Sequence, residues 1–164
     1  MTVGRVVPVL NIIKDRSTNM YRVLITDDEK IEREGIKFLL AQEEGEYEIH
    51  EAANGRQALN VLRSEEIDFL LTDIKMPHMD GLELASKVRE EYPNLPIVIF
   101  SGYSDFAFAQ EAMRYGVKDY VLKPVDPDTF HTTIGKVKAE LQSIRSKKQK
   151  EEKGKNFLLQ DRKS

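Results

Sequence analysis

Residues 67–84 read IDFLLTDIKMPHMDGLEL, and the fold prediction starts from the strand, loop and helix that this stretch predicts. A continuous apolar run, 67–72, is typical of a strand that is buried on both faces. It stops at the acid Asp73 and is followed by a loop that contains Pro77. Asp80 then precedes a helical pattern and is a candidate N-cap. The stretch therefore predicts a buried strand, a short loop and a helix.

The same alternation of strand and helix occurs five times along the chain. The expected strands are 21–26, 47–52, 67–72, 96–101 and 119–124. The expected helices are 29–42, 55–65, 80–92, 106–116 and a last one from Asp128 onward. Strict alternation favours an α/β fold, a doubly wound five-stranded parallel sheet with helices on both faces. The three most apolar runs, 21–26, 67–72 and 96–101, are expected to be the inner strands.

Composition excludes several classes of protein. The net charge of −3 offers no overall basic surface for nucleic acid. No apolar run approaches the ~20 residues of a membrane span. The chain has no cysteine, so disulfides and thiolate metal sites are excluded. Residues 1–19 precede a second methionine, Met20, and we expect them to be a disordered extension before the natural start; the alternative is an extra strand or arm.

Chemistry-bearing residues stand at the ends of four of the five expected strands. Asp27 and Asp28 come after the first strand and Asp73 after the third, while Ser101 and Lys123 stand at the ends of the fourth and the fifth. Ligands of such sheets bind at the carboxyl ends of the strands, so these residues should share one edge. Carboxylates brought together repel each other unless a cation is present, and Mg²⁺ favours oxygen ligands. These residues together predict a Mg²⁺-dependent site at which an aspartate accepts a phosphoryl group. The alternative is that each residue has a local structural role: Asp28 could cap a helix, and Asp73 could hold a turn.

Four motifs make residues 20–145 similar to a known family. They are ITDDE (25–29), LLTDIKMPHMDG (70–81), FSGY (100–103) and DYVLKP (119–124). Together they resemble the receiver domain of bacterial two-component response regulators. The resemblance implies a flavodoxin-like sheet with strand order 2-1-3-4-5.

The resemblance also implies a role for each acid of the site. Asp73 looks like the phospho-acceptor, and Asp27 and Asp28 look like the Mg²⁺-binding pair, with Asp28 a direct ligand. The backbone carbonyl of Lys75 would be a further ligand. The cofactor implied is therefore Mg²⁺, held by Asp27, Asp28, Asp73 and this carbonyl.

Three further residues match the family's response to phosphorylation. Ser101 resembles the hydroxyl that bonds the phosphoryl group, at a position where threonine is commoner. Lys123 resembles the lysine that pairs with the phosphoryl group, and the following peptide bond to Pro124 is usually cis in the family. Tyr120 resembles the aromatic switch that turns inward when Ser101 moves.

The stretch 101–126 resembles more narrowly the YesN-type branch, whose members usually carry an AraC-type DNA-binding domain. We expect residues 146–164 to be a helical linker toward such an output domain, absent from this chain, and 156–161 to enter a further helix. The implied partners are a sensor histidine kinase and a second copy of the chain. The second copy would bind to the face made by helix 106–116, strand 119–124 and the last helix. DNA would be bound only through the missing domain. No membrane partner is expected, and a cytoplasmic location is expected.

Competing functions remain at this point. The expected function is a phosphorylation switch that controls transcription, not a turnover enzyme, and the alternative is a stand-alone receiver that acts only by binding proteins. A haloacid-dehalogenase-type phosphatase would need an acid two residues after Asp73, where Lys75 stands. A flavodoxin would need a phosphate-binding loop after the first strand, where the chain is acidic. Phe106, Phe108 and Met113 could serve dimerisation, although a place in the core is expected for at least two of them.

Overall fold

The central sheet has five parallel strands in the order β2-β1-β3-β4-β5, which confirms the predicted topology. The computed structural model describes residues 20–102 and 106–163, with side chains through residue 154, so the expectation for residues 1–19 lies outside the described residues. The strands are β1 (Met20–Thr26), β2 (Glu46–Ala52), β3 (Phe69–Asp73), β4 (Ile97–Ser101) and β5 (Asp119–Leu122). The inner strands are β1, β3 and β4, as predicted.

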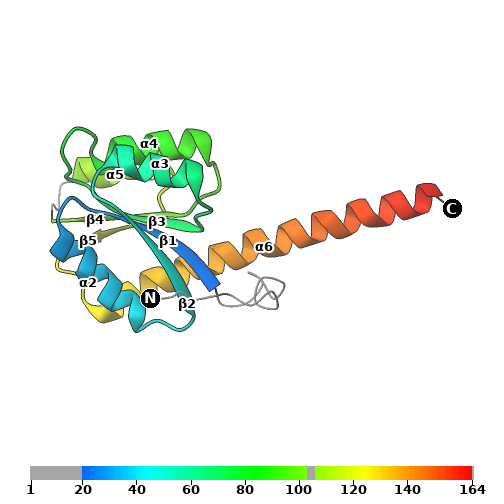
Figure 1. Ribbon diagram of the computed structural model, residues 1–164, viewed down its shortest axis with the longest axis horizontal. Coiled ribbons are helices and arrows are strands. Elements are labelled where there is room, and N and C mark those ends of the chain that lie inside the picture. Colours follow the sequence, from blue (N-terminus) through cyan, green and yellow to red (C-terminus); the bar gives the residue numbers. More distant parts are fainter. Residues whose placement is uncertain (1–19, 103–105, 164) are drawn as a thin grey trace.

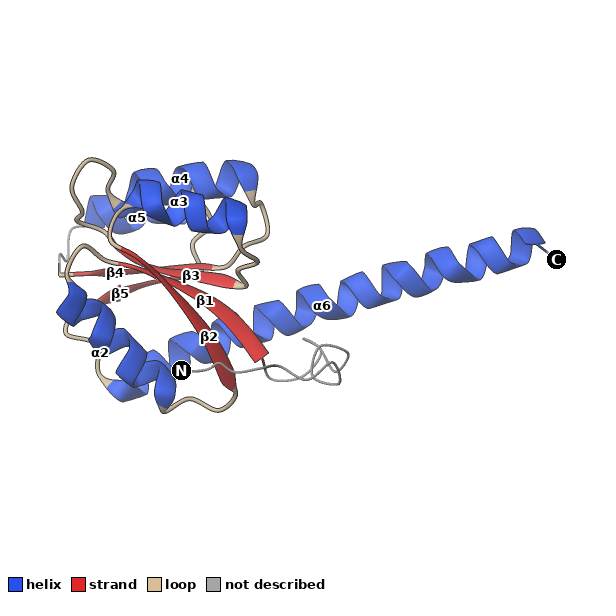
Figure 2. Cartoon of the chain, viewed as in Figure 1, coloured by secondary structure: helices blue, strands red, loops and turns tan. Residues whose placement is uncertain are grey.

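Helices cover both faces of this sheet. They are α2 (Lys30–Ala41), α3 (Gly55–Ser64), α4 (Gly81–Glu91), α5 (Phe106–Arg114) and α6 (Pro127–Lys163). Figure 1 shows α3, α4 and α5 together on one face and α2 with the beginning of α6 on the other. Figure 2 shows the sheet as the middle layer of the three. Because all the strands are parallel, their carboxyl ends lie at one edge of the sheet, where the chain leaves each strand toward the next helix.

Burial on both faces explains why the inner strands read as continuous apolar runs. Every residue of β3 and of β4 is buried. Along β1, Leu24 belongs to the core beneath α3, α4 and α5, whereas Val23 and Ile25 belong to the core beneath α2 and α6. The edge strand β2 has no such run, because exposed acids stand between its partly buried residues and only its last residue, Ala52, is buried.

Two local expectations were wrong. The strand β3 begins at Phe69 and not at residue 67, because the Asp68 carboxylate accepts a hydrogen bond from the backbone N–H of Arg22 at 2.7 Å. On α5, Phe106 is 75% exposed and Met113 is 53% exposed, so the core placement of at least two of the three apolar residues fails. Phe108 is partly buried against the core, and Ala112 is fully buried.

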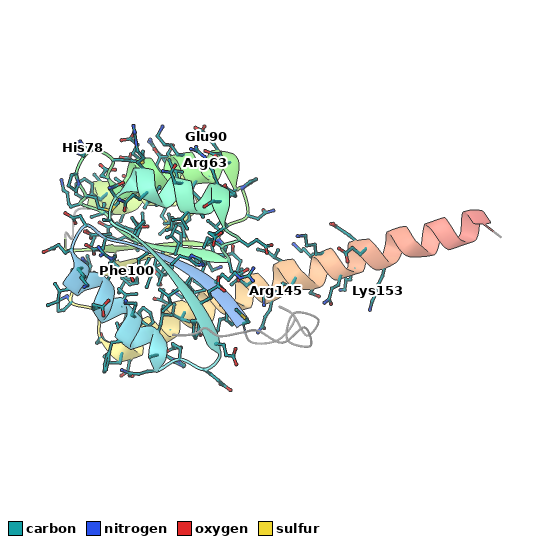
Figure 3. All side chains as sticks on the ribbon, viewed as in Figure 1. Arg63, His78, Glu90, Phe100, Arg145 and Lys153 are labelled. Atoms are coloured by element: carbon teal, nitrogen blue, oxygen red, sulfur yellow. The ribbon has the colours of Figure 1, made fainter. Side chains whose placement is uncertain are left out.

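The last helix is much longer than the domain requires. Its first half packs on the sheet through Phe130, Ile134, Val137 and Leu141. Beyond them, the helix continues away from the domain, and Figure 3 shows Lys153 on this projecting part. The backbone is one uninterrupted helix through Lys163, so 156–161 does not begin a separate helix. Among the described residues, no helix combines the length and the apolarity needed to cross a bilayer.

Candidate functional site: an acidic pocket at the carboxyl edge of the sheet

The pocket forms where β1 and β3 end side by side. Asp73 is the last residue of β3, and Asp27 and Asp28 directly follow β1. Carboxylate oxygens of the three residues lie within 4.8 Å of one another. Asp27 is 5% exposed and Asp73 is 9% exposed, whereas Asp28 is open to solvent. Three converging hard oxygen donors suit Mg²⁺, which prefers carboxylates and water, so the residues present fit this ion.

The chain after Asp73 is folded tightly back against it. The backbone N–H of Gly81 donates a hydrogen bond to the carbonyl of Ile74 at 2.7 Å. A Cβ at Gly81 would lie 2.3 Å from the carbonyl oxygen of Asp73, so only glycine fits at this position. Asp80 caps α4 as predicted, since its carboxylate accepts from the N–H of Glu83 at 2.8 Å. The loop thus fixes the backbone of Asp73 from behind.

Lys123 brings a single positive charge to the acids. Its Nζ lies 3.2 Å from Asp73 Oδ1, 3.3 Å from Asp27 Oδ2 and 2.7 Å from Glu32 Oε1. The lysine is placed by the end of β5, where its backbone N–H donates to the carbonyl of Ser101 at 2.7 Å. The Lys123–Pro124 peptide is cis, as the resemblance implies.

Burial and charge shift the pKa values of the pocket in a consistent direction. Burial raises the pKa of Asp73, and the neighbouring Asp27 raises it further, although Lys123 partly opposes both. Burial likewise raises the pKa of Asp27, against the N–H of Glu29 and Lys123. For Lys123, burial lowers the pKa, but Glu32, Asp73 and Asp27 together raise it above its ordinary value. Keeping Asp27 and Asp73 charged therefore costs free energy in this pocket, and Lys123 offsets only part of that cost.

The alternative interpretation of Asp28 as a helix cap is not what the structure shows. The N-cap of α2 is Glu29, whose side chain makes no capping hydrogen bond. Asp27 instead accepts from the N–H of Glu29 at 2.9 Å. The Asp28 side chain is left facing solvent at the rim of the pocket, next to the other two acids.

The remaining predicted residues lie on or near the same edge. Ser101 ends β4, the strand that pairs with β3, and is fully buried, and Tyr120 lies in β5, half-buried against the core beneath α3, α4 and α5. Lys75 follows Asp73 by two residues, and its side chain is exposed, with the amine 5.4 Å from the centre of the Phe108 ring. The role of the Lys75 backbone carbonyl as a metal ligand stays a prediction.

A cleft of about 540 Å³ opens beside the acids, between α2 and the chain after β5. Its wall is apolar on the sheet side, where Ile25, Leu71 and Phe100 contribute. Figure 3 shows Phe100 on the side of the sheet that faces α2. Asp27, Asp73, Glu32 and Lys123 form its charged end. The acidic pocket is therefore open to solvent on one side and to a partly apolar cleft on another.

This combination of sheet order, acids and lysine matches a known family over most of the chain. Residues 23–135 match the family model described as the response regulator receiver domain. The chain belongs to the response regulator receiver family. Its predicted strand order and its resemblance to receiver domains are thereby confirmed.

Relatives of this receiver domain include proteins named as transcriptional regulators. It is 38% identical over 132 residues to the transcriptional regulatory protein YesN of Bacillus subtilis, covering 79% of this chain and 36% of YesN. It is 33% identical over 121 residues to the transcriptional regulatory protein HptR of Staphylococcus aureus, covering 72% of this chain and 46% of HptR. The chain thus spans less than half the length of either relative.

Solved receiver domains have the same fold. The receiver domain of AraT from Geobacillus stearothermophilus is 40% identical, with a TM-score of 0.68 over 76% of this chain and 98% of that one. The response regulator TrrA from Thermotoga maritima, in complex with Mg²⁺ and beryllofluoride, is 32% identical, with a TM-score of 0.65 over 72% of this chain and 99% of that one.

One residue of the receiver's pocket was missed from the sequence. Glu32 makes the shortest of the three carboxylate contacts to Lys123. It stands in the first turn of α2, four residues after Asp28, so it is close in the chain to the two acids that follow β1. The spacing could have suggested that Glu32 faces the carboxyl edge. It could not have shown that Glu32 contacts the lysine, because both side chains are long and have many rotamers.

Proposed function

We propose that this receiver accepts a phosphoryl group on Asp73 from a sensor histidine kinase and thereby switches conformation. The observation that carries the proposal is the convergence of Asp27, Asp28 and Asp73 around a site that Lys123 also reaches. In the transfer, a carboxylate oxygen of Asp73 forms a bond to phosphorus, and the bond from phosphorus to the kinase's histidine nitrogen breaks. Phosphoryl transfer needs positioning and charge neutralisation above all, which these residues supply.

The pocket's residues divide this work. Asp27, Asp28, Asp73 and the backbone carbonyl of Lys75 would hold Mg²⁺, which when bound offsets the charge of the carboxylates and of the incoming phosphoryl group. Lys123, 3.2 Å from Asp73, pairs with a phosphoryl oxygen. The fixed backbone behind Asp73 keeps its carboxylate beside Lys123 and the two acids that follow β1.

The switch would run from the pocket to the face made by α5, β5 and α6. Ser101 bonds the phosphoryl group and moves toward it, and Tyr120 then buries more of its ring. Three large apolar side chains stand exposed on α5 and β5, as a dimer contact requires: Phe106, Met113 and Leu122. Such a response is a shift between two populated conformations. Its output would be control of a DNA-binding domain through the helical linker of residues 146–164.

Intact mass measurement after incubation with Mg²⁺ and acetyl phosphate tests the acceptor. The wild type should gain the mass of one phosphoryl group, and Asp73→Asn should gain none. Asp128→Asn is the matched control, because it removes an exposed acid in the first turn of α6, and it should behave as wild type. Equal gain in Asp73→Asn would overturn the assignment. Size-exclusion chromatography with beryllofluoride, where a shift to dimer is expected, tests the α5-β5-α6 face.

A further inference from the structure

Glu32 occupies a place in the pocket that neither the metal nor the phosphoryl transfer explains. It is the third residue of α2, and its carboxylate lies 2.7 Å from Lys123 Nζ. It is not one of the three acids whose oxygens converge within 4.8 Å. Its side chain is 39% exposed, so it could point into solvent and instead contacts the lysine.

The lysine has no hydrogen-bond donor to spare in this arrangement. An ammonium group has three N–H donors and no acceptor. Lys123 Nζ lies within 3.3 Å of three carboxylates, Asp27, Asp73 and Glu32. Phosphorylation converts the Asp73 carboxylate into an acyl phosphate, so a phosphoryl oxygen can take over the contact that Asp73 makes with Lys123. Asp27 belongs to the acidic cluster that fits Mg²⁺, so Glu32 is the contact outside that cluster that draws Lys123 away from the phosphoryl oxygen.

We propose that Glu32 is a positioning residue that holds Lys123 in the unphosphorylated receiver and competes with the phosphoryl group for it. The inference rests on the proposed function, to which it adds a built-in restraint. While Glu32 pairs with the lysine, part of the free energy of the phosphoryl–lysine contact is used to separate the two side chains. Glu32 thereby weakens the phosphorylated state without contacting the reacting atoms.

The structure provides a place for Glu32 to move to. Glu32 lines the 540 Å³ cleft together with Gly35, which lies one turn further along α2. A Cβ built at Gly35 would meet nothing within 4 Å, so this side of the helix is open. The released carboxylate can therefore be hydrated, and its separation from Lys123 leaves no buried charge unpaired.

The affinity for beryllofluoride at saturating Mg²⁺, measured by titration calorimetry, tests the proposal, since beryllofluoride is a stable mimic of the phosphoryl group. Glu32→Gln should bind it about twofold to fivefold more tightly than wild type, the range expected when a partly exposed ion pair no longer competes. Glu34→Gln is the control, because it makes the same change of charge on α2, where Glu34 pairs with Lys37. The control should match wild type within about twofold.

A second titration separates competition from a general charge effect. Removal of any nearby negative charge favours an anion and disfavours a cation, so the Mg²⁺ affinity of Glu32→Gln and Glu34→Gln should change alike. The inference is wrong if Glu32→Gln binds beryllofluoride with the same affinity as Glu34→Gln, or more weakly than wild type. Either result would leave the proposed function standing. If wild type and both variants fail to bind beryllofluoride, the proposed function itself has failed.

Discussion

At the amino edge of the sheet, charged side chains are matched with opposite charges, whereas at the carboxyl edge they are not. Arg22 lies 3.3 Å from Glu48 and 2.8 Å from Glu66 at the amino edge. Arg145 of α6 lies 3.6 Å from Asp68 and 5.1 Å from the centre of the Tyr21 ring. Figure 3 shows Arg145 where α6 leaves the domain.

At the carboxyl edge, several acids share one lysine. Asp27, Asp73 and Glu32 all contact Lys123, and Asp28 lies beside them. Burial raises the pKa values of both Asp27 and Asp73, which means that holding them charged costs free energy. The amino edge therefore stabilises the fold, whereas the carboxyl edge has an excess of negative charge that a bound cation can offset.

The largest expected effect comes from crowding the backbone behind Asp73. Gly81→Ala should destabilise the protein by about 1–3 kcal/mol, because the new Cβ cannot fit against the Asp73 carbonyl without a backbone shift. The same shift should reduce phosphoryl uptake. Urea unfolding and the mass assay measure the two effects.

Gly135→Ala is the matched control for this substitution. A Cβ at Gly135 meets nothing within 4 Å, and the residue lies inside α6. Alanine should therefore stabilise the helix by about 0.5–1 kcal/mol. If Gly81→Ala is as stable as Gly135→Ala, the backbone at the acidic pocket is not as tightly held as the close approach indicates.

A smaller effect should follow when one acid of the carboxyl edge loses its charge. Without Mg²⁺, Asp73→Asn should be more stable than wild type by about 1 kcal/mol, or roughly 2–4 °C in Tm. Added Mg²⁺ should stabilise the wild type more than the variant, because binding to the folded state adds to its stability. Thermal unfolding with EDTA and with Mg²⁺ measures both differences.

The pH dependence of that difference gives a further check. The pKa of Asp73 is raised in the folded state above its ordinary 3.8, so the folded protein binds the proton more tightly than the unfolded chain does. The cost of the charged carboxylate is therefore present at neutral pH and disappears as the pH falls through the raised pKa. The advantage of Asp73→Asn should shrink on acidification. If the stability difference between Asp73→Asn and wild type grows as the pH falls, the charged carboxylate of Asp73 stabilises the folded protein.

The smallest expected effect lies at the amino edge. Arg145→Met should cost about 0.5 kcal/mol, because it removes the contact with the Tyr21 ring and a partly exposed ion pair with Asp68. Beryllofluoride affinity should not change, since the site is at the opposite edge. Lys148→Met, an exposed position on the same helix, is the control for stability. A changed beryllofluoride affinity in Arg145→Met would show that the two edges are coupled.

The sequence was sufficient for those parts of the site that depend on strand direction. Parallel strands end at one edge, so Asp27, Asp73 and Lys123 could be placed together from their positions after apolar runs. The N-cap at Asp80 was predictable for a similar reason, since it depends on its immediate neighbours in the chain. These predictions needed only local pattern and topology.

The sequence was insufficient where a side chain has a choice of surroundings. Phe106 and Met113 have the spacing of core residues, yet the sheet face of α5 is filled by Ala112 and Phe108. The pairing of Glu32 with Lys123 joins residues 91 positions apart and depends on how α2 lies against the end of β5. Apolar spacing does not determine which of several surfaces a helix leaves exposed.

The length of α6 gives it the geometry of a lever. Its 37 residues span about 55 Å at 1.5 Å per residue, and the 19 residues from Arg145 to Lys163 account for about 28 Å of that. A tilt of about 10° where the helix leaves the sheet would carry its far end through about 5 Å. A displacement too small to alter the packing around Phe130 and Ile134 would therefore become a large change of position for whatever contacts the end of the helix.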